Sequence, residues 1–120
     1  MTPQGRESRF MTYPEFIEEI KKTKFWEKRV DSPNLLEFVV DQENLNTLTP
    51  LLQNYFGLPL KPPGHAPSRE ANAYSAAYGG IQKSQTLYYV DSGAFTHCAL
   101  LWPWSDGKLI TVKVAQVLKK

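Results

Sequence analysis

The chain has 120 residues, of which 42% are hydrophobic and 22% charged, and its formal net charge is +2 at pH 7. This composition is ordinary for a globular protein, and a chain of this length can bury about two thirds of its unfolded surface, so neither disulfides nor a structural metal is needed for stability. The lone cysteine, Cys98, cannot form an internal disulfide, and no segment approaches the ~20 apolar residues of a membrane span. These features exclude a disulfide-rich secreted protein, disfavour a membrane span and favour a cytoplasmic location.

Residues 1–10 are predicted to form a disordered leader, because they are polar, contain a proline and a glycine, and show no periodic apolar positions. We expect a single α+β domain over residues 11–120. Its first helix should begin at residues 12–15, which offer an N-cap hydroxyl, a proline where no helical N–H is lost, and a glutamate that reaches back to the cap. The apolar residues that follow recur at helical spacing, so this helix should bury one face and end near Lys24.

Residues 35–40 are apolar and partly β-branched, which predicts a strand. Asp41 can then cap a second helix, whose leucines and aromatic residues share one face. Gly57 should end this helix by adopting the left-handed conformation that often follows a helix C-terminus. Pro50 lies inside the pattern, so the helix is either kinked at that position or begins again there.

Residues 58–67 are rich in proline and cannot sustain a helix or a central strand, so they should run as an extended crossover packed on the domain. Residues 68–78 should then form a short helix, capped by Ser68 and ended by the glycines that follow. The sequence contains no internal repeat, heptad pattern or low-complexity tract.

Three strands are predicted near the C-terminus, at residues 86–90, 95–102 and 108–118. The Asp-Gly dipeptide between the last two is a strong hairpin signal. As a two-residue loop it places His97 opposite Gln116 on the face that should meet the core. The fold we expect is therefore α+β, with two or three N-terminal helices packed on a C-terminal antiparallel β-meander.

Tyr88 and His97 form the candidate ligand site. If Ser92 and Gly93 make a two-residue turn, the two side chains lie opposite each other, and in a cavity between helices and sheet they could bind a small molecule or transfer protons. The simpler interpretation is that His97 lies at the edge of the core and that its ring nitrogens only make structural hydrogen bonds. Cys98 is next to His97 on the same strand and faces away from it, which excludes a dyad and predicts a small buried hydrophobe.

No catalytic residue, metal ligand or cofactor-binding residue is assigned from the sequence. One histidine lies in the proline-rich crossover and the other shares a predicted strand with the cysteine, a pattern without metal-ligand spacing, so we expect no metal and no cofactor. Paired carboxylates, a nucleophile–base pair and a phosphate loop are also missing from the sequence. Whether the chain is an enzyme therefore stays open.

The predicted meander has a second face that is too apolar to lie freely in water. Two explanations are open. In the first, two copies of the chain associate as a homodimer through this face, with a tryptophan as the anchor. The candidate interface residues are Leu100, Trp102, Leu109 and Thr111. In the second, the helix at residues 68–78 or the crossover folds over the same face.

Three functions are open on this basis. The first is a non-catalytic protein-binding or assembly module, whose partner is another protein or a second copy of the chain. The second is a small-molecule-binding protein or minor enzyme with a pocket between helices and sheet near Tyr88 and His97. The third, a platform for single-stranded nucleic acid around Trp102 and Trp104, is disfavoured because lysines but no arginine lie in or beside the C-terminal strands. No membrane partner is expected.

Overall fold

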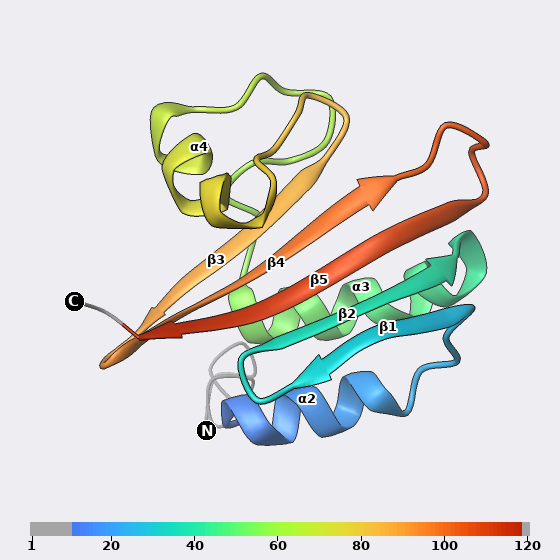
Figure 1. Cartoon of the computed structure of the whole chain (residues 1–120), viewed down its shortest axis with the longest axis horizontal. Helices are drawn as coiled ribbons and strands as arrows, with labels where there is room; N and C mark the ends of the chain where they lie inside the picture. The colour runs from blue at the N-terminus through green and yellow to red at the C-terminus, as the bar shows by residue number, and fades with distance from the viewer. Residues whose placement is uncertain (1–10, 119–120) are drawn as a thin grey trace, which may run out of the picture.

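The structure, a computed structural model, describes residues 11–118. Its main feature is a five-stranded antiparallel sheet. The helices are α2 (Tyr13–Lys21), α3 (Gln42–Phe56), α4 (Arg69–Ser75) and the short 3₁₀ helix η2 (Ala76–Tyr78). The strands are β1 (Glu27–Ser32), β2 (Leu35–Asp41), β3 (Thr86–Ser92), β4 (Phe95–Pro103) and β5 (Leu109–Leu118). Their order in the sheet is β1-β2-β5-β4-β3, so the last strand of the chain lies in the middle (Figure 1). The predicted leader, residues 1–10, lies outside the described residues.

The mixed α+β fold and its antiparallel sheet are confirmed, but the predicted arrangement of the elements is wrong in part. The helices are not all N-terminal to the sheet, because α3 lies between β2 and β3 in the chain. The sheet is not purely C-terminal either, since β2 pairs with β5 along its whole length and carries β1 at its other edge. The N-terminal half of the chain therefore contributes a hairpin to the same sheet as the meander.

The first helix begins as its sequence predicts. The Thr12 side chain accepts a hydrogen bond from the Glu15 backbone N–H at 3.2 Å, and the Glu15 carboxylate accepts one from the Thr12 N–H at 2.8 Å. This reciprocal capping box satisfies donors that the first helical turn leaves unpaired. Phe16 and Ile20 are fully buried on the inner face of α2. The helix ends at Lys21, somewhat before the predicted end.

The second predicted helix is continuous. The Asp41 side chain accepts a hydrogen bond from the Asn44 backbone N–H at 2.9 Å and caps α3 as expected. Pro50 lies inside the helix without interrupting it, so of the two alternatives a restart at the proline is wrong. Gly57 ends the helix, but with φ +83° and ψ −156° it does not adopt the predicted left-handed helical conformation; glycine reaches this positive φ without steric cost.

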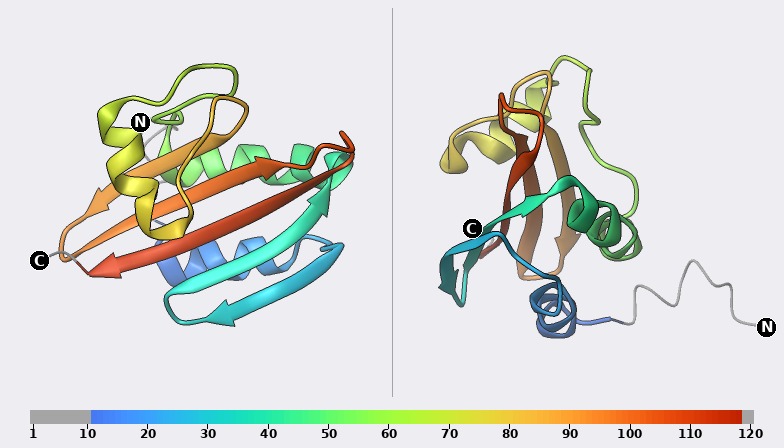
Figure 2. Two further views of the ribbon diagram at one scale, coloured as in Figure 1. Left: turned by 45° about the horizontal axis from the view of Figure 1, so that its top comes forward. Right: turned by 90° about the vertical axis from the view of Figure 1, so that its right-hand side faces the viewer.

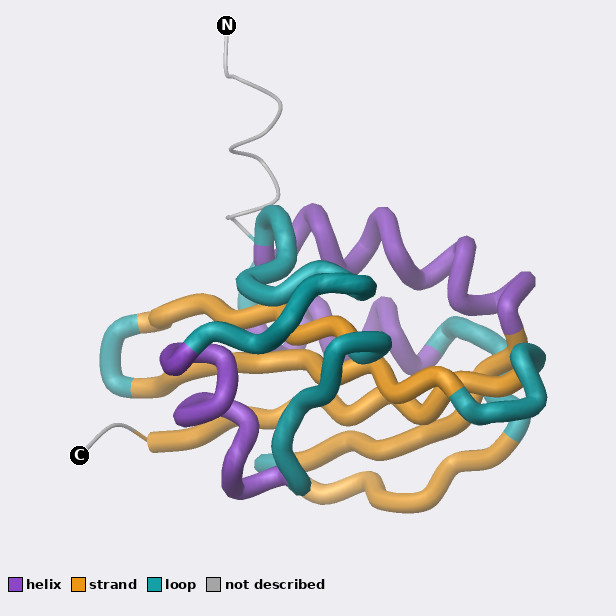
Figure 3. The backbone as a smooth tube through the Cα atoms, turned by 90° about the horizontal axis from the view of Figure 1, so that it is seen from above, coloured by secondary structure: helices purple, strands orange, loops and turns teal. Residues whose placement is uncertain are grey.

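The sheet separates two hydrophobic cores. Helices α2 and α3 pack on one face, and α4 with η2 lies on the other (Figure 2, Figure 3). The larger core, beneath α2 and α3, includes Phe16, Phe38, Leu48, Leu52, Val112 and Val114. The smaller core, beneath α4 and η2, consists of Ala71, Ile81, Leu87, Cys98, Leu100 and Ala115. Both faces of the C-terminal strands are therefore buried within the chain.

Lys61 attaches the proline-rich crossover to β3. Its backbone exchanges two hydrogen bonds with that of Leu87, at N-to-O distances of 3.2 and 3.0 Å. Only 2% of the residue is exposed, and its Nζ donates to the carbonyl oxygens of Pro62 at 3.0 Å, of Lys83 at 2.6 Å and of Gln85. An ammonium group has three hydrogens to donate. The three carbonyl oxygens therefore match the donors of this buried cation.

Candidate functional site

A cavity of about 680 Å³ opens where α2 and α3 meet one end of the sheet. Its walls come from the start of α2, the last turn of α3 and the β3–β4 turn, which lie together on the left of Figure 1. His97 on β4 and Gln116 on β5 also line it. We call this hollow the His97 cavity.

His97 is the centre of a chain of hydrogen bonds in this cavity. Only 3% of the residue is exposed. Its Nδ1 lies 2.7 Å from the Tyr55 hydroxyl oxygen, and its Nε2 lies 3.0 Å from Oε1 of Gln116. Both ring nitrogens are therefore engaged, and one imidazole connects α3 with β4 and β5.

Aromatic rings hold this imidazole in place. Tyr13 stacks on His97 with ring centroids 4.1 Å apart and planes 22° from parallel. Phe95 lies on the same strand as His97, at a centroid distance of 6.5 Å and an angle of 18°. Tyr55 is itself stacked on Phe16, at 4.3 Å and 7°. Packing therefore determines where the hydrogen-bonding groups of the cavity lie.

The ionisable rings of the cavity are uncharged near neutral pH. Burial lowers the pKa of His97, and the hydrogen bond with Gln116 offsets part of this effect. Burial also raises the pKa of Tyr55 to about 12 and holds the pKa of Tyr13 well above its ordinary value. These side chains therefore act as neutral hydrogen-bonding groups and not as ions.

The structure places His97, but not Tyr88, in this cavity. Tyr88 lies opposite Ala99, and Val90 occupies the position opposite His97. The Tyr88 ring is buried against Phe56, with ring centroids 5.8 Å apart. The predicted pairing of Tyr88 with His97 is therefore wrong.

The error lies in the β3–β4 turn. Ser92 pairs with Phe95, which makes Gly93 and Ala94 the two-residue loop in place of Ser92 and Gly93. Gly93 has a φ of +72°, and no described residue other than glycine has a positive φ. This pattern matches a type II′ turn, in which glycine is the first of the two loop residues. The predicted loop has glycine in second place, which is typical of a type I′ turn and would require a positive φ at Ser92 as well.

Tyr13, Tyr55 and Gln116 are site residues that the sequence did not reveal as such. Helical periodicity assigns both tyrosines to the inner faces of their helices, but it does not say which part of the sheet each helix end meets. Gln116 lies opposite His97 in the predicted register, and this pairing is confirmed. Two polar side chains opposed on an inward-facing sheet surface are the one sequence signal that points to this site.

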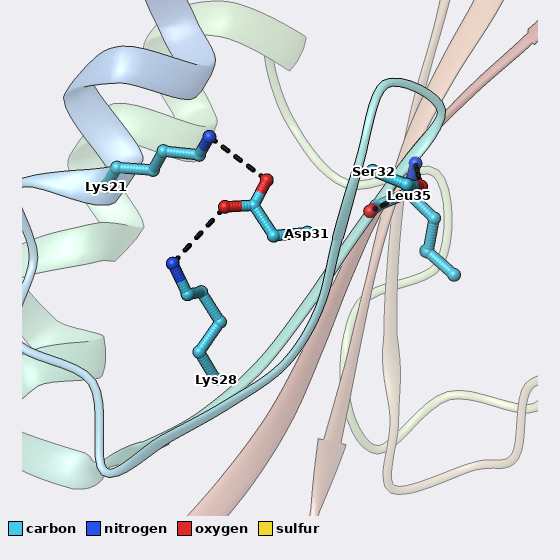
Figure 4. Close-up of polar contacts among 5 residues, drawn as sticks. All are labelled: Lys21, Lys28, Asp31, Ser32 and Leu35. Atoms are coloured by element: carbon cyan, nitrogen blue, oxygen red, sulfur yellow. Dashed lines mark hydrogen bonds and ion pairs between the residues drawn. The ribbon is translucent and has the colours of Figure 1, made fainter.

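Tyr13 and Gln116 also line a second hollow, of about 430 Å³. Charged side chains border it, and Figure 4 shows how Lys21 and Lys28 converge on Asp31. The two ion pairs have N-to-O distances of 3.1 and 3.2 Å, and the hydrogen bonds from Lys21 and then Lys28 lower the pKa of Asp31. Exposed ion pairs of this kind contribute little to stability. The Lys21–Asp31 pair connects α2 to β1 at the edge of the hollow.

The predicted self-association surface is largely used within the chain. Leu100 is fully buried in the smaller core, beneath α4 and η2. Thr111 is 5% exposed and accepts a hydrogen bond from Nε1 of Trp104 at 2.8 Å. Trp102 and Leu109 are half-buried. The cover of this face is thus internal, as in the second explanation, and Leu100 and Thr111 are not accessible to a partner. Self-association as such stays a prediction, which sedimentation at high micromolar concentration tests.

Residues 11–118 contain no helix that is both long and apolar enough to span a membrane. In the same part of the chain, no three His, Cys, Asp or Glu side chains lie close enough together to hold a metal ion. Comparison of the chain with protein-family models, with curated proteins and with solved structures finds no significant match. Function is therefore inferred from the geometry of the His97 cavity.

Proposed function

We propose that the chain binds a small organic molecule in the His97 cavity and does not catalyse a reaction on it. The observation that carries this proposal is the chain of hydrogen bonds from Tyr55 through His97 to Gln116, in a hollow of about 680 Å³. Ligand pockets typically have volumes of about 300–1,000 Å³ and combine apolar or aromatic walls with a few fixed polar groups. The His97 cavity has both properties.

The ligand should be planar and should carry no negative charge, since Asp91 also lines the cavity. No lysine or arginine is found among the described residues that line the cavity, and its imidazole is uncharged, so these groups do not neutralise a phosphate or carboxylate. The rings of Tyr13 and Phe95 offer faces and edges against which a flat ring system can pack. The amides of Gln53 and Asn54 at the same wall can bind polar substituents.

Binding is favoured over catalysis because His97 has no free ring nitrogen. A general base must reach the proton that it removes, but Nδ1 is engaged with Tyr55 and Nε2 with Gln116, so His97 could act on a ligand only through the Tyr55 hydroxyl, whose pKa burial raises to about 12. Cys98 offers no alternative nucleophile. It lies in the smaller core on the other face of the sheet, and burial raises the pKa of its thiol to about 12.

Titration with a set of planar fragments, followed by NMR with assigned resonances, tests the proposal. We expect at least one neutral bicyclic fragment to shift the signals of Tyr55, His97 and Gln116 in a saturable way. Phe95→Leu should weaken this binding about 2- to 10-fold, because an aromatic contact contributes about 0.5–1.5 kcal/mol.

Tyr74→Leu is the matched control for this substitution. Tyr74 stacks on Tyr89 at a centroid distance of 3.9 Å and belongs to α4, on the other face of the sheet. Its replacement should leave the affinity unchanged. Shifts that appear only outside the cavity, or no shifts with any planar fragment, would show that the His97 cavity is not a ligand site.

A further inference from the structure

The direction of the hydrogen-bond chain determines what the cavity offers to a ligand. Oε1 of Gln116 can only accept, so Nε2 of His97 carries the hydrogen between them. A neutral imidazole has a single N–H, which leaves Nδ1 as an acceptor. The 2.7 Å contact with Tyr55 is then a hydrogen bond that the hydroxyl donates. Each group donates to the next, in the order Tyr55, His97, Gln116.

Tyr55 consequently faces the cavity as an acceptor. Its one hydroxyl hydrogen is engaged with His97, and the oxygen retains a lone pair for a further partner. The tyrosine ring stacks on Phe16 at 4.3 Å and meets Phe56 edge-on at 5.1 Å, so the oxygen is held in position. If the chain ran in the opposite direction, the hydroxyl would be free to donate. The two directions therefore select ligands of opposite hydrogen-bonding character.

We infer that the His97 cavity selects planar ligands that donate a hydrogen bond from the ring edge to Oη of Tyr55, such as N–H heteroaromatic compounds and phenols. This inference rests on the proposed function and names the ligand class for the same site. A ligand of the same shape without the donor leaves the tyrosine oxygen without that partner. The loss of one hydrogen bond of ordinary strength corresponds to about a 3- to 10-fold lower affinity.

Indole and benzofuran are suitable probes, because they have nearly the same shape and carry either an N–H or an oxygen at one ring position. We expect the wild-type chain to bind indole about 3- to 10-fold more tightly than benzofuran. NMR of the imidazole nitrogens should place the hydrogen of His97 on Nε2 in the free protein. This second measurement does not depend on a ligand.

Gln116→Met tests whether Gln116 sets the direction of the chain. The substitution removes the accepting oxygen, so the affinities for indole and benzofuran should become similar. Gln42→Met is the matched control, since it makes the same change on α3 at a residue that does not line the cavity, and it should preserve the preference. Loss of the preference in both variants would overturn the role of Gln116.

The outcomes separate the inference from the proposed function. Equal affinities of the wild-type chain for the two probes, a preference for benzofuran, or a hydrogen on Nδ1 of His97 would overturn the inference and leave the cavity a ligand site. If neither these probes nor any other planar fragment shifts the resonances of the cavity, the proposed function fails, and the inference fails with it.

Discussion

Replacing Gly79 by alanine tests how closely the segment over the smaller core is docked on the sheet. Gly79 follows η2 with a φ of +102°, and a Cβ built there would lie 2.7 Å from Cη2 of Trp102. A left-handed conformation costs an L-residue about 1–2 kcal/mol, and an added methyl group in a packed contact costs about 1–3 kcal/mol. Gly79→Ala should therefore lower the free energy of unfolding by about 2–5 kcal/mol.

Gly80 supplies the matched control. Its φ is +82°, but a Cβ built on it would meet nothing within 4 Å. Gly80→Ala should therefore show only the backbone cost, about 1–2 kcal/mol. Urea unfolding followed by far-ultraviolet circular dichroism measures both variants. Equal losses of unfolding free energy in the two variants would refute the reasoning, because the Trp102 ring would then move away from the methyl group without cost. This ring is held in place by Lys113, whose Nζ lies 3.9 Å from its centroid.

The free energy of unfolding should fall as the pH drops below 6.5, which is the ordinary pKa of imidazole. Burial lowers the pKa of His97 in the folded state, so the unfolded chain binds a proton more readily than the folded one. Urea unfolding at several pH values on both sides of 6.5 measures this dependence of the unfolding free energy on pH. The dependence should weaken in His97→Gln and persist in His65→Gln, which replaces an exposed histidine. An unchanged dependence in His97→Gln would contradict burial of a neutral ring. Cys98 is 4% exposed and burial raises its pKa to about 12, so the native protein should resist alkylation near neutral pH and react once unfolded. Rapid labelling of the native chain in mass spectrometry would count against this expectation.

The register of the β4–β5 hairpin could be predicted because it depends on where the tip of the hairpin lies. With the Asp-Gly dipeptide at the tip, His97 falls opposite Gln116, as the structure shows. The observed loop is wider than the predicted one, since the last pair of the ladder is Pro103 with Ile110. Widening a loop equally on both sides leaves every other pair unchanged, so the register was insensitive to this error.

Strand β1 could not be predicted from hydrophobic periodicity, because hardly any of it is buried. Of the residues in Glu27–Ser32, Val30 is half-buried and the others are exposed. The strand lies at the edge of the sheet, where charged side chains discourage pairing with another chain. The composition that protects the edge therefore also removes the alternating pattern by which strands are recognised.

Half of the candidate site could be predicted for the same reason as the register. His97 and Gln116 belong to one hairpin, so local geometry brings them together. Tyr13 and Tyr55 come from two helices, and the position of each helix end on the sheet depends on how the side chains of the whole core fit together. No local pattern contains that information, so the hydrogen-bond chain and the stacked ring were visible only in the folded structure.

The backbone contact between Lys61 and Leu87 brings the two ends of the intervening segment together at the edge strand β3. Residues 62–85, which include α4 and η2, form a long loop whose two ends already meet. A segment of this kind can open as one unit while the strands beneath it stay paired, and it can change in length without a new distance to span. What lies over Leu100 could therefore be exchanged during evolution independently of the His97 cavity on the opposite face.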